Sequence, residues 1–164
     1  MARSLAPRGR PSPYNRAMSV LSAADREHVR ELFAGLPHDV KLLFFSRSVG
    51  CELCPDTKRI LQELVAASPR VSFEELNLVL DKERAEAYGV TEAPAIVVLR
   101  QPADGELWDP GICFVGAPLG YEFTSLVDAI TLVSTGDSRL SEESRSLVAA
   151  VTSPLHIQVY VTPT

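Results

Sequence analysis

Several features that define other classes of protein are missing from this sequence. The chain of 164 residues contains no uninterrupted apolar run of about 18 residues, which a membrane-spanning helix would need. Its three cysteines are too few for a secreted fold built on disulfides. The net charge of -5 is opposite in sign to the clustered Lys and Arg of a nucleic-acid-binding protein. We therefore expect neither a membrane nor a nucleic acid as a partner.

What is present is the composition of a globular protein. Hydrophobic residues make up 46% of the chain and charged residues 23%, and the length suits one domain with a sizeable core. Residues 1–17 differ, because they carry four arginines, three prolines and no acid. The prolines argue against the amphipathic helix of a mitochondrial presequence, and no apolar core of a secretory signal is present. We expect a disordered tail over 1–17, or a true start at Met18.

The reactive chemistry is concentrated in Cys51-Glu52-Leu53-Cys54. An apolar, β-prone run over 40–45 precedes this motif, and apolar residues at helical spacing follow it as far as Ser68-Pro69. The pattern predicts Cys51 at a helix N-terminus, where unpaired N–H groups and the helix dipole stabilise a thiolate. Cys54, one turn later on the same face, can close a small disulfide ring. We predict that Cys51 attacks and Cys54 resolves.

Other interpretations of the two thiols remain open. A structural zinc site needs two more ligands, and the remaining Cys and His residues are scattered along the chain (His28, His38, Cys113 and His156). We therefore predict no metal site, although an iron–sulfur cluster shared by two chains is an alternative. Cys113 falls in a predicted strand and is expected to be a small buried hydrophobe. Arg47 would lower the Cys51 pKa and Glu52 would raise it, both modestly because they are expected to be exposed.

The rest of the chain alternates strands and helices. Beyond the first strand and the cysteine helix, we predict a parallel strand over 71–78, a charged helix over 81–88 and a buried strand over 95–99. A loop over 102–111, which holds Trp108, leads to an antiparallel strand over 112–115 and a helix over 119–133. An additional helix, capped by Ser22, ends near Gly35 and precedes the first strand. The predicted order is α, then β-α-β-α-β-β-α.

That order, with the Cys-X-X-Cys motif after the first strand and Ala93-Pro94 before the third, resembles the thioredoxin and glutaredoxin superfamily. The resemblance implies a three-layer α/β fold in which Pro94 is cis and faces the disulfide. It also implies that the backbone of Ala93 pairs with an extended substrate peptide. Many thioredoxins place an acid in the strand before the motif to accept the resolving thiol's proton. Residues 40–45 contain none, so Glu75 is the nearest substitute, and an ordinary solvated charge is the simpler interpretation.

A narrower resemblance is carried by Phe114-Val115-Gly116-Ala117-Pro118-Leu119-Gly120-Tyr121-Glu122-Phe123. It is similar to the protein disulfide oxidoreductases of archaea and thermophilic bacteria, the glutaredoxin-like domain proteins, which contain two thioredoxin-like units. A predicted helix over 140–151 and strand over 155–161 repeat the helix and strand of 21–45. In the family a second Cys-X-X-Cys follows, whereas this sequence stops at Thr164. We expect a thioredoxin-like domain over 18–136 and a partial second unit over 137–164.

The sequence thus predicts a thiol–disulfide oxidoreductase of protein substrates, working in the cytoplasm. The resemblance suggests a thioredoxin-reductase-like flavoprotein as electron donor and implies no bound cofactor. A single site in place of two is expected to give weak activity. The alternatives are a peptide-binding adaptor with this fold and a metal or iron–sulfur protein. The strand over 155–161 has unpaired edges, so it should dock on the sheet edge or form a homodimer.

Overall fold

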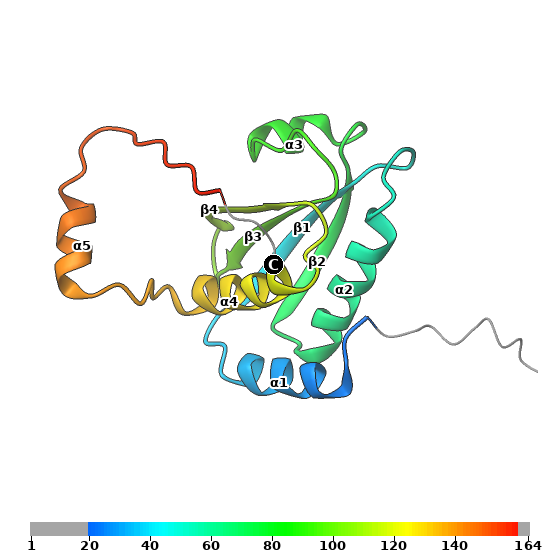
Figure 1. Ribbon diagram of the computed structural model, residues 1–164, viewed down its shortest axis with the longest axis horizontal. Helices are drawn as coiled ribbons and strands as arrows, with labels where there is room; N and C mark the ends of the chain where they lie inside the picture. The colour runs from blue at the N-terminus through cyan, green and yellow to red at the C-terminus, as the bar shows by residue number, and fades with distance from the viewer. Residues whose placement is uncertain (1–19, 161–164) are drawn as a thin grey trace, which may run out of the picture.

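The first helix shows how local sequence sets the element boundaries in this protein. A computed structural model describes residues 20–160, and in it α1 spans Ala23–Ala34 (Figure 1). The Ser22 side chain accepts a hydrogen bond from the backbone N–H of Asp25 at 3.1 Å, and the Asp25 carboxylate accepts one from the Ser22 N–H at 3.2 Å. This reciprocal capping satisfies donors that the helix itself leaves unpaired. The predicted helix is confirmed. The tail predicted for 1–17 lies outside the described residues.

A four-stranded sheet forms the centre of the described chain, in the order β2-β1-β3-β4. Its strands are β1 (Asp39–Ser46), β2 (Val71–Asn77), β3 (Ala95–Gln101) and β4 (Trp108–Val115). The crossover through α2 (Cys54–Ala67) makes β1 and β2 parallel, as predicted, and the β1–β3 and β3–β4 pairs are antiparallel. The central position of β1 explains its nearly continuous apolar sequence, because both of its faces are covered.

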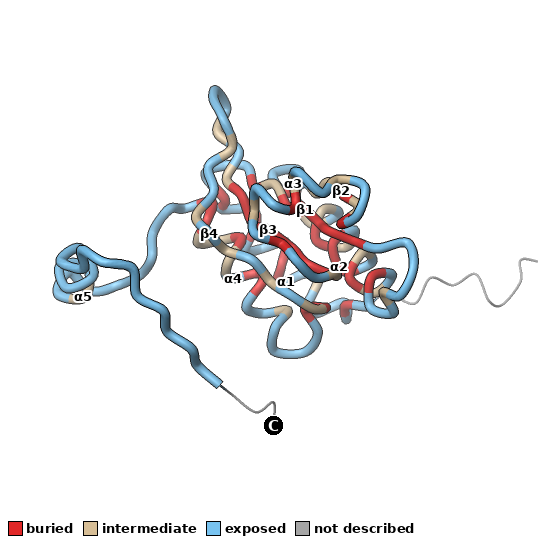
Figure 2. The backbone as a smooth tube through the Cα atoms, turned by 90° about the horizontal axis from the view of Figure 1, so that it is seen from above, coloured by how far each residue is buried: buried red, intermediate tan, exposed pale blue. Residues whose placement is uncertain are grey.

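Helices cover the sheet on both faces, which confirms the three-layer α/β fold. On one face, α1, α2 and α4 (Tyr121–Thr135) surround a core that includes Phe33, Phe44, Leu61 and Ile130. On the other face, α3 (Lys82–Ala87) packs through Ala85 over a smaller core that includes Phe45, Leu76 and Val97. In Figure 2 the buried stretches follow the strands and the inner sides of these helices.

Two predictions about β4 were wrong. Trp108 begins this strand instead of lying in the preceding loop, and its ring stacks against the Arg100 guanidinium at 4.5 Å. Cys113 is exposed, not buried. The exposure of Cys113 has a clear cause: β4 is an edge strand, and the α3-side core draws on β1, β2 and β3 without it. Cys113 and Val115, which share a face of β4, are left exposed.

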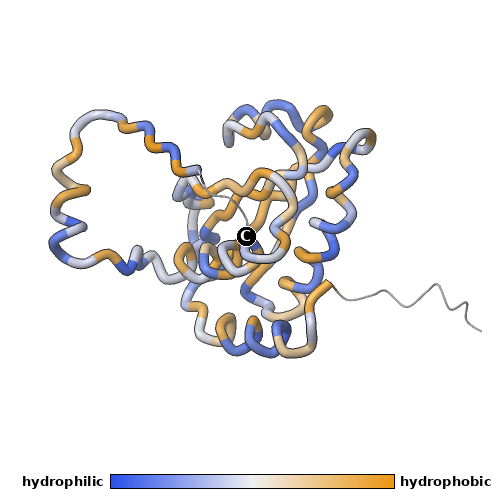
Figure 3. The backbone as a smooth tube through the Cα atoms, viewed as in Figure 1, coloured by the Kyte–Doolittle hydropathy of each residue, from blue (hydrophilic) through white to orange (hydrophobic). Residues whose placement is uncertain are grey.

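The last described segment, residues 137–160, is called the arm below. Arg139 still lines a cavity with Ile112 of β4, but from Leu140 onward the arm lies away from the sheet, as Figure 2 shows best (Figures 1 and 2). Helix α5 (Glu142–Ala149) forms as predicted, but it has no buried residue. The strand predicted over 155–161 is absent from its described part, since residues 151–160 form no ladder. Its apolar residues are exposed, as Leu155 (67%) and Ile157 (79%) show, and apolar stretches recur along the arm in Figure 3. The alternating pattern is therefore present without a partner strand.

No helix within residues 20–160 combines the length and the apolar character that crossing a membrane requires.

Candidate active site

The cysteine motif lies where β1 gives way to α2. The structure joins Cys51 and Cys54 in a disulfide, with their Cα atoms 5.4 Å apart. Contrary to prediction, Cys51 precedes the helix: α2 begins at Cys54, with Leu53 as its N-cap. Pro55 in the first turn, where its missing N–H costs nothing, fits this later start. No side chain caps α2, so its positive end is left facing the turn that holds the disulfide.

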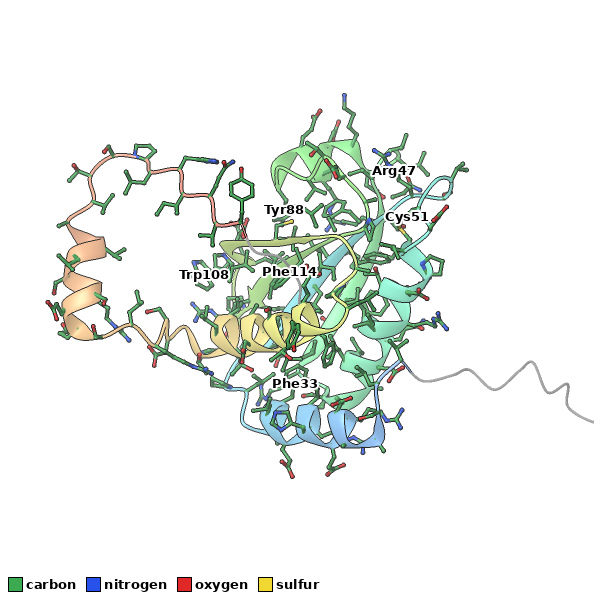
Figure 4. The ribbon with its side chains drawn as sticks, viewed as in Figure 1. Phe33, Arg47, Cys51, Tyr88, Trp108 and Phe114 are labelled. Atoms are coloured by element: carbon green, nitrogen blue, oxygen red, sulfur yellow. A yellow bond between two sulfur atoms is a disulfide. The ribbon has the colours of Figure 1, made fainter. Side chains whose placement is uncertain are left out.

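The two sulfurs differ in access to solvent. Cys51 is half-buried in the turn, whereas Cys54 is 7% exposed and belongs to the main core cluster. An incoming substrate disulfide therefore meets Cys51 first. Cys54, on the core side, can then attack only the Cys51 sulfur. Figure 4 shows Cys51 next to the N-terminal end of α2, with Arg47 nearby and with Trp108 toward the opposite edge of the sheet, on β4. This arrangement is suited to one attacking and one resolving thiol.

A cavity of about 320 Å³ opens beside the disulfide. Both cysteines line it, together with Ser46, Arg47, Ser48, Pro55, Lys58 and Glu75. The Glu75 carboxylate is held from two sides: Lys58 Nζ lies 2.5 Å from Oε2, and the Ser46 hydroxyl donates to Oε1 at 3.1 Å. The structure thus brings the sequence-predicted Glu75 and Arg47 to the cysteines, although Glu75 is also 36% exposed. The exposed Glu52 is not part of the cavity lining.

Sequence reasoning missed Lys58 and Ser46. Lys58 is four residues after Cys54 on α2, a spacing that places both on one face of the helix and could have identified it. Ser46 gave no comparable signal, because its role depends on β1 and β2 being neighbours, with Ser46 opposite Asn77.

The second predicted feature of the site is the peptide bond before β3. The Ala93–Pro94 bond is cis, as the resemblance implied. Pro94 is buried, and its carbonyl accepts a hydrogen bond from the Gly116 N–H at 2.8 Å. Ala93 and Cys51 are both partly buried against the core cluster that contains Cys54. The same packing unit therefore holds the proline loop and the disulfide.

Neither Cys113 nor a group of metal-ligating side chains forms a second candidate site among the described residues. Although the Cys113 side chain is exposed, partial desolvation of its sulfur and then the nearby charge of Asp109 raise the pKa of this thiol, which disfavours the thiolate. Cys113 does not line the cavity of the disulfide. In the described part of the chain, no three His, Cys, Asp or Glu side chains are grouped so that they could hold a metal ion.

Comparison with known proteins places this geometry in a fold family. No family model matches the chain. An N-terminal domain of the alkylhydroperoxide reductase AhpF from Enterococcus faecalis superposes with a TM-score of 0.69 at 25% identity, over 79% of this chain and 60% of that one. A protein disulfide oxidoreductase from Aeropyrum pernix gives a TM-score of 0.66 at 22% identity, over 79% and 54%. The chain is a thioredoxin-fold protein.

Curated relatives of this thioredoxin-fold chain are much longer proteins. An NADH dehydrogenase of Ferdinandcohnia aciditolerans is 30% identical over 106 residues, which are 65% of this chain and 17% of the relative. An alkyl hydroperoxide reductase of Staphylococcus aureus is 28% identical over 149 residues, 88% of this chain and 25% of the relative. The chain therefore spans a quarter or less of the length of these relatives.

Proposed function

We propose that this thioredoxin-fold chain is a thiol–disulfide oxidoreductase that works through Cys51 and Cys54. The observation that carries the proposal is the pairing of an accessible Cys51 with a buried Cys54 at the uncapped start of α2. The positive helix end favours a thiolate over a thiol at this position. The likeness to the AhpF domain and to the longer peroxide reductase supports the same chemistry.

In the reductive direction, the Cys51 thiolate attacks one sulfur of a substrate disulfide. A Cys51–substrate bond forms, the substrate S–S bond breaks, and the second substrate sulfur leaves as a thiolate that takes up a proton. Cys54, after giving up its proton, attacks Cys51 Sγ and releases the first substrate sulfur. Two electrons have then passed from the cysteine pair to the substrate, and the pair is a disulfide. The reverse sequence oxidises a substrate dithiol.

The proposal extends to substrates and to an electron donor. The Ala93 backbone beside Pro94 would pair with an extended protein substrate, and Arg47, Glu52 and Glu75 would modulate the thiols. A flavoprotein of the thioredoxin-reductase kind would return electrons, in a reducing compartment such as the cytoplasm. The similarity to an NADH dehydrogenase and to a peroxide reductase favours a place in an electron-transfer chain of this sort.

The arm beyond α4 belongs to the proposal as well. Residues 18–136 would form the catalytic domain, and 137–164 would begin a second unit, with α5 as its helix and with a segment over 155–161 whose described part forms no ladder in this structure. The formed helix α5, and the fact that this chain spans 54% to 60% of the similar structures, support that division. A homodimer through the arm is proposed as the arrangement that covers its apolar residues.

The reduction potential of the cysteine pair tests the function. The protein is equilibrated against glutathione, alkylated and weighed by mass spectrometry, with Cys113→Ser as the background so that only one pair reacts. A reduction potential of about -270 mV would mark a reductant, and one of about -120 mV would mark an oxidant. Cys54→Ser should trap a mixed disulfide with a peptide disulfide, and Cys51→Ser should not. If the Cys51→Ser variant retained full biological function, a peptide-binding adaptor with this fold would be favoured instead. Stoichiometric iron or zinc in the purified protein would favour a metal or iron–sulfur protein.

A further inference from the structure

A groove runs along α1, between this helix and the neighbouring α4 (Figure 1). It consists of two cavities of about 270 and 110 Å³, which have three lining residues in common, Asp25, Phe123 and Thr124. Val20 lines the first cavity, and Leu32 and Asp128 line the second. The combined hollow, called the α1–α4 groove below, therefore extends from the residues before α1 to the last turn of this helix. It shares no lining residue with the cavity of the cysteines.

The lining of this groove combines apolar and acidic side chains. Val20 and Leu32 are 36% and 37% exposed, so apolar surface is left uncovered in both cavities. The Asp25 carboxylate is engaged in the cap of α1. Asp128 is exposed and forms no ion pair within residues 20–160. His28 is the other ionisable residue of the lining. A segment that fills the groove therefore needs apolar side chains and a cation near Asp128.

The chain that directly precedes the groove has this composition. Residues 1–17 carry four arginines and no acid. The part next to Val20 reads Pro13-Tyr14-Asn15-Arg16-Ala17-Met18-Ser19. It supplies apolar side chains on both sides of a single cation, Arg16. The charge of this segment is opposite to that of the exposed Asp128.

The point of attachment places this segment beside the groove. The Glu63 carboxylate accepts hydrogen bonds from the backbone N–H groups of Val20 and Leu21, at 2.6 and 3.3 Å, and so fixes the chain where α1 is about to begin. Four residues of extended chain, the separation of Arg16 from Val20, span about 12 Å. The groove follows α1 for about two helical turns, or about 10 Å. A chain that turns back along α1 therefore brings Arg16 to the far end of the groove.

We propose that residues 13–19 dock in the α1–α4 groove and run antiparallel to α1, with the Arg16 guanidinium on the Asp128 carboxylate. The apolar side chains of the segment cover Leu32 and Phe123, which removes apolar surface from water. The inference goes beyond the proposed function, because the groove and the cysteine pair are separate sites.

A spin label at the start of the segment tests the docking in the full chain. Ser12→Cys carries the label in a Cys113→Ser background, and the Cys51–Cys54 disulfide is kept so that no other thiol reacts. NMR signals of backbone amides close to the label then lose intensity.

The amides of Leu32 and Val127, which line the second cavity, are expected to lose most of their signal. The amide of Ala85, in α3 on the other face of the sheet, should keep its signal. Full signal at Leu32 and Val127 would overturn the proposal.

Charge reversal tests the pairing of Arg16 with Asp128. Arg16→Glu and Asp128→Lys should each restore the lost signals, because like charges then meet in the groove. The double variant recreates the pair in reverse, so the signal loss should return. Glu27→Lys is the matched control, since Glu27 is an exposed acid of α1 that lines neither cavity, and the loss should persist in it. If the single variants behave like Glu27→Lys, or if the double variant does not regain the loss, the pairing is wrong.

A mixed sample distinguishes docking within one chain from docking between copies. Isotope-labelled chain without the spin label is mixed with spin-labelled chain of natural isotope content. Unchanged signals at Leu32 and Val127 in this mixture would support docking within one chain, whereas a loss would assign the groove to the segment of a second copy and overturn the proposal. None of these measurements requires redox cycling, so failure here leaves the proposed function standing.

Discussion

Glu74 and its neighbour Glu75 on β2 lie on opposite faces of the sheet and have different partners. Side chains alternate along β2, so the two glutamates point to opposite faces of the sheet. Glu75 reaches the cavity of the cysteines, whereas Glu74 pairs with Lys41 of β1 at 2.6 Å and with Arg84 of α3. Hydrogen bonds from Arg84 and then from Lys41 lower the pKa of Glu74 to about 2.

Glu74→Gln should therefore destabilise the protein in a pH-dependent way. The folded pKa of about 2 lies below the ordinary value of 4.5, so the carboxylate stabilises the fold above pH 4.5 and loses this effect as pH falls toward 2. Solvent screening reduces the contribution to about 1 kcal/mol. Urea unfolding at pH 7, 4 and 2.5 should show a gap between wild type and variant that narrows with acid. A constant gap would mean that packing, not charge, is lost.

At the scale of elements, α4 and α5 are expected to contribute very differently to stability. Leu126 of α4 is fully buried in the main core, whereas Leu147 of α5 is 67% exposed. Leu126→Ala should cost about 2–5 kcal/mol through the cavity it leaves. Leu147→Ala, the same chemical change, should leave the urea midpoint nearly unchanged. A large loss at Leu147 would show that α5 packs against something in solution.

The order of elements was predictable because hydrophobic spacing and stop signals are local. The apolar run of β1, the capping residue Ser22 and the spacing in α2 each predicted their element. The start of α2 was predicted three residues early, although Pro55 already indicates the later start. A helix beginning at Cys51 would place Pro55 where its N–H is needed, and a start at Cys54 does not.

What could not be predicted depends on neighbours that are distant in sequence. Cys113 was expected to be buried because its strand is apolar, but only the sheet order shows that β4 is an edge. The same holds for Ser46, whose hydrogen bond to Glu75 requires the β1–β2 register. The spacing from Cys54 could have placed Lys58 on the cysteine face of α2, but its ion pair with Glu75 depends on the fold. The alternation of apolar and polar residues over 155–160 predicts which side chains would share a face of a strand, but it does not predict which strand would pair with it.

Across the whole molecule, the thioredoxin-like core and the arm differ in how their apolar residues are covered. The core buries large side chains on both faces of the sheet, such as Phe44 and Phe45. The arm exposes Leu155, Ile157 and Val159 together, and α5, with eight residues, is too short to be stable in isolation. An apolar arm of this kind favours association between chains.

We therefore expect self-association that depends on the arm. Sedimentation over a range of protein concentrations should show a mass that rises toward a dimer. Ile157→Lys should keep the chain monomeric, because it places a charge among the exposed apolar side chains. His156→Lys adds the same group to the alternate face and should still associate. Both variants should retain the wild-type redox equilibrium, since the arm stands apart from Cys51. A mass independent of concentration, with fast amide exchange throughout 155–160, would contradict a dimer formed by this arm.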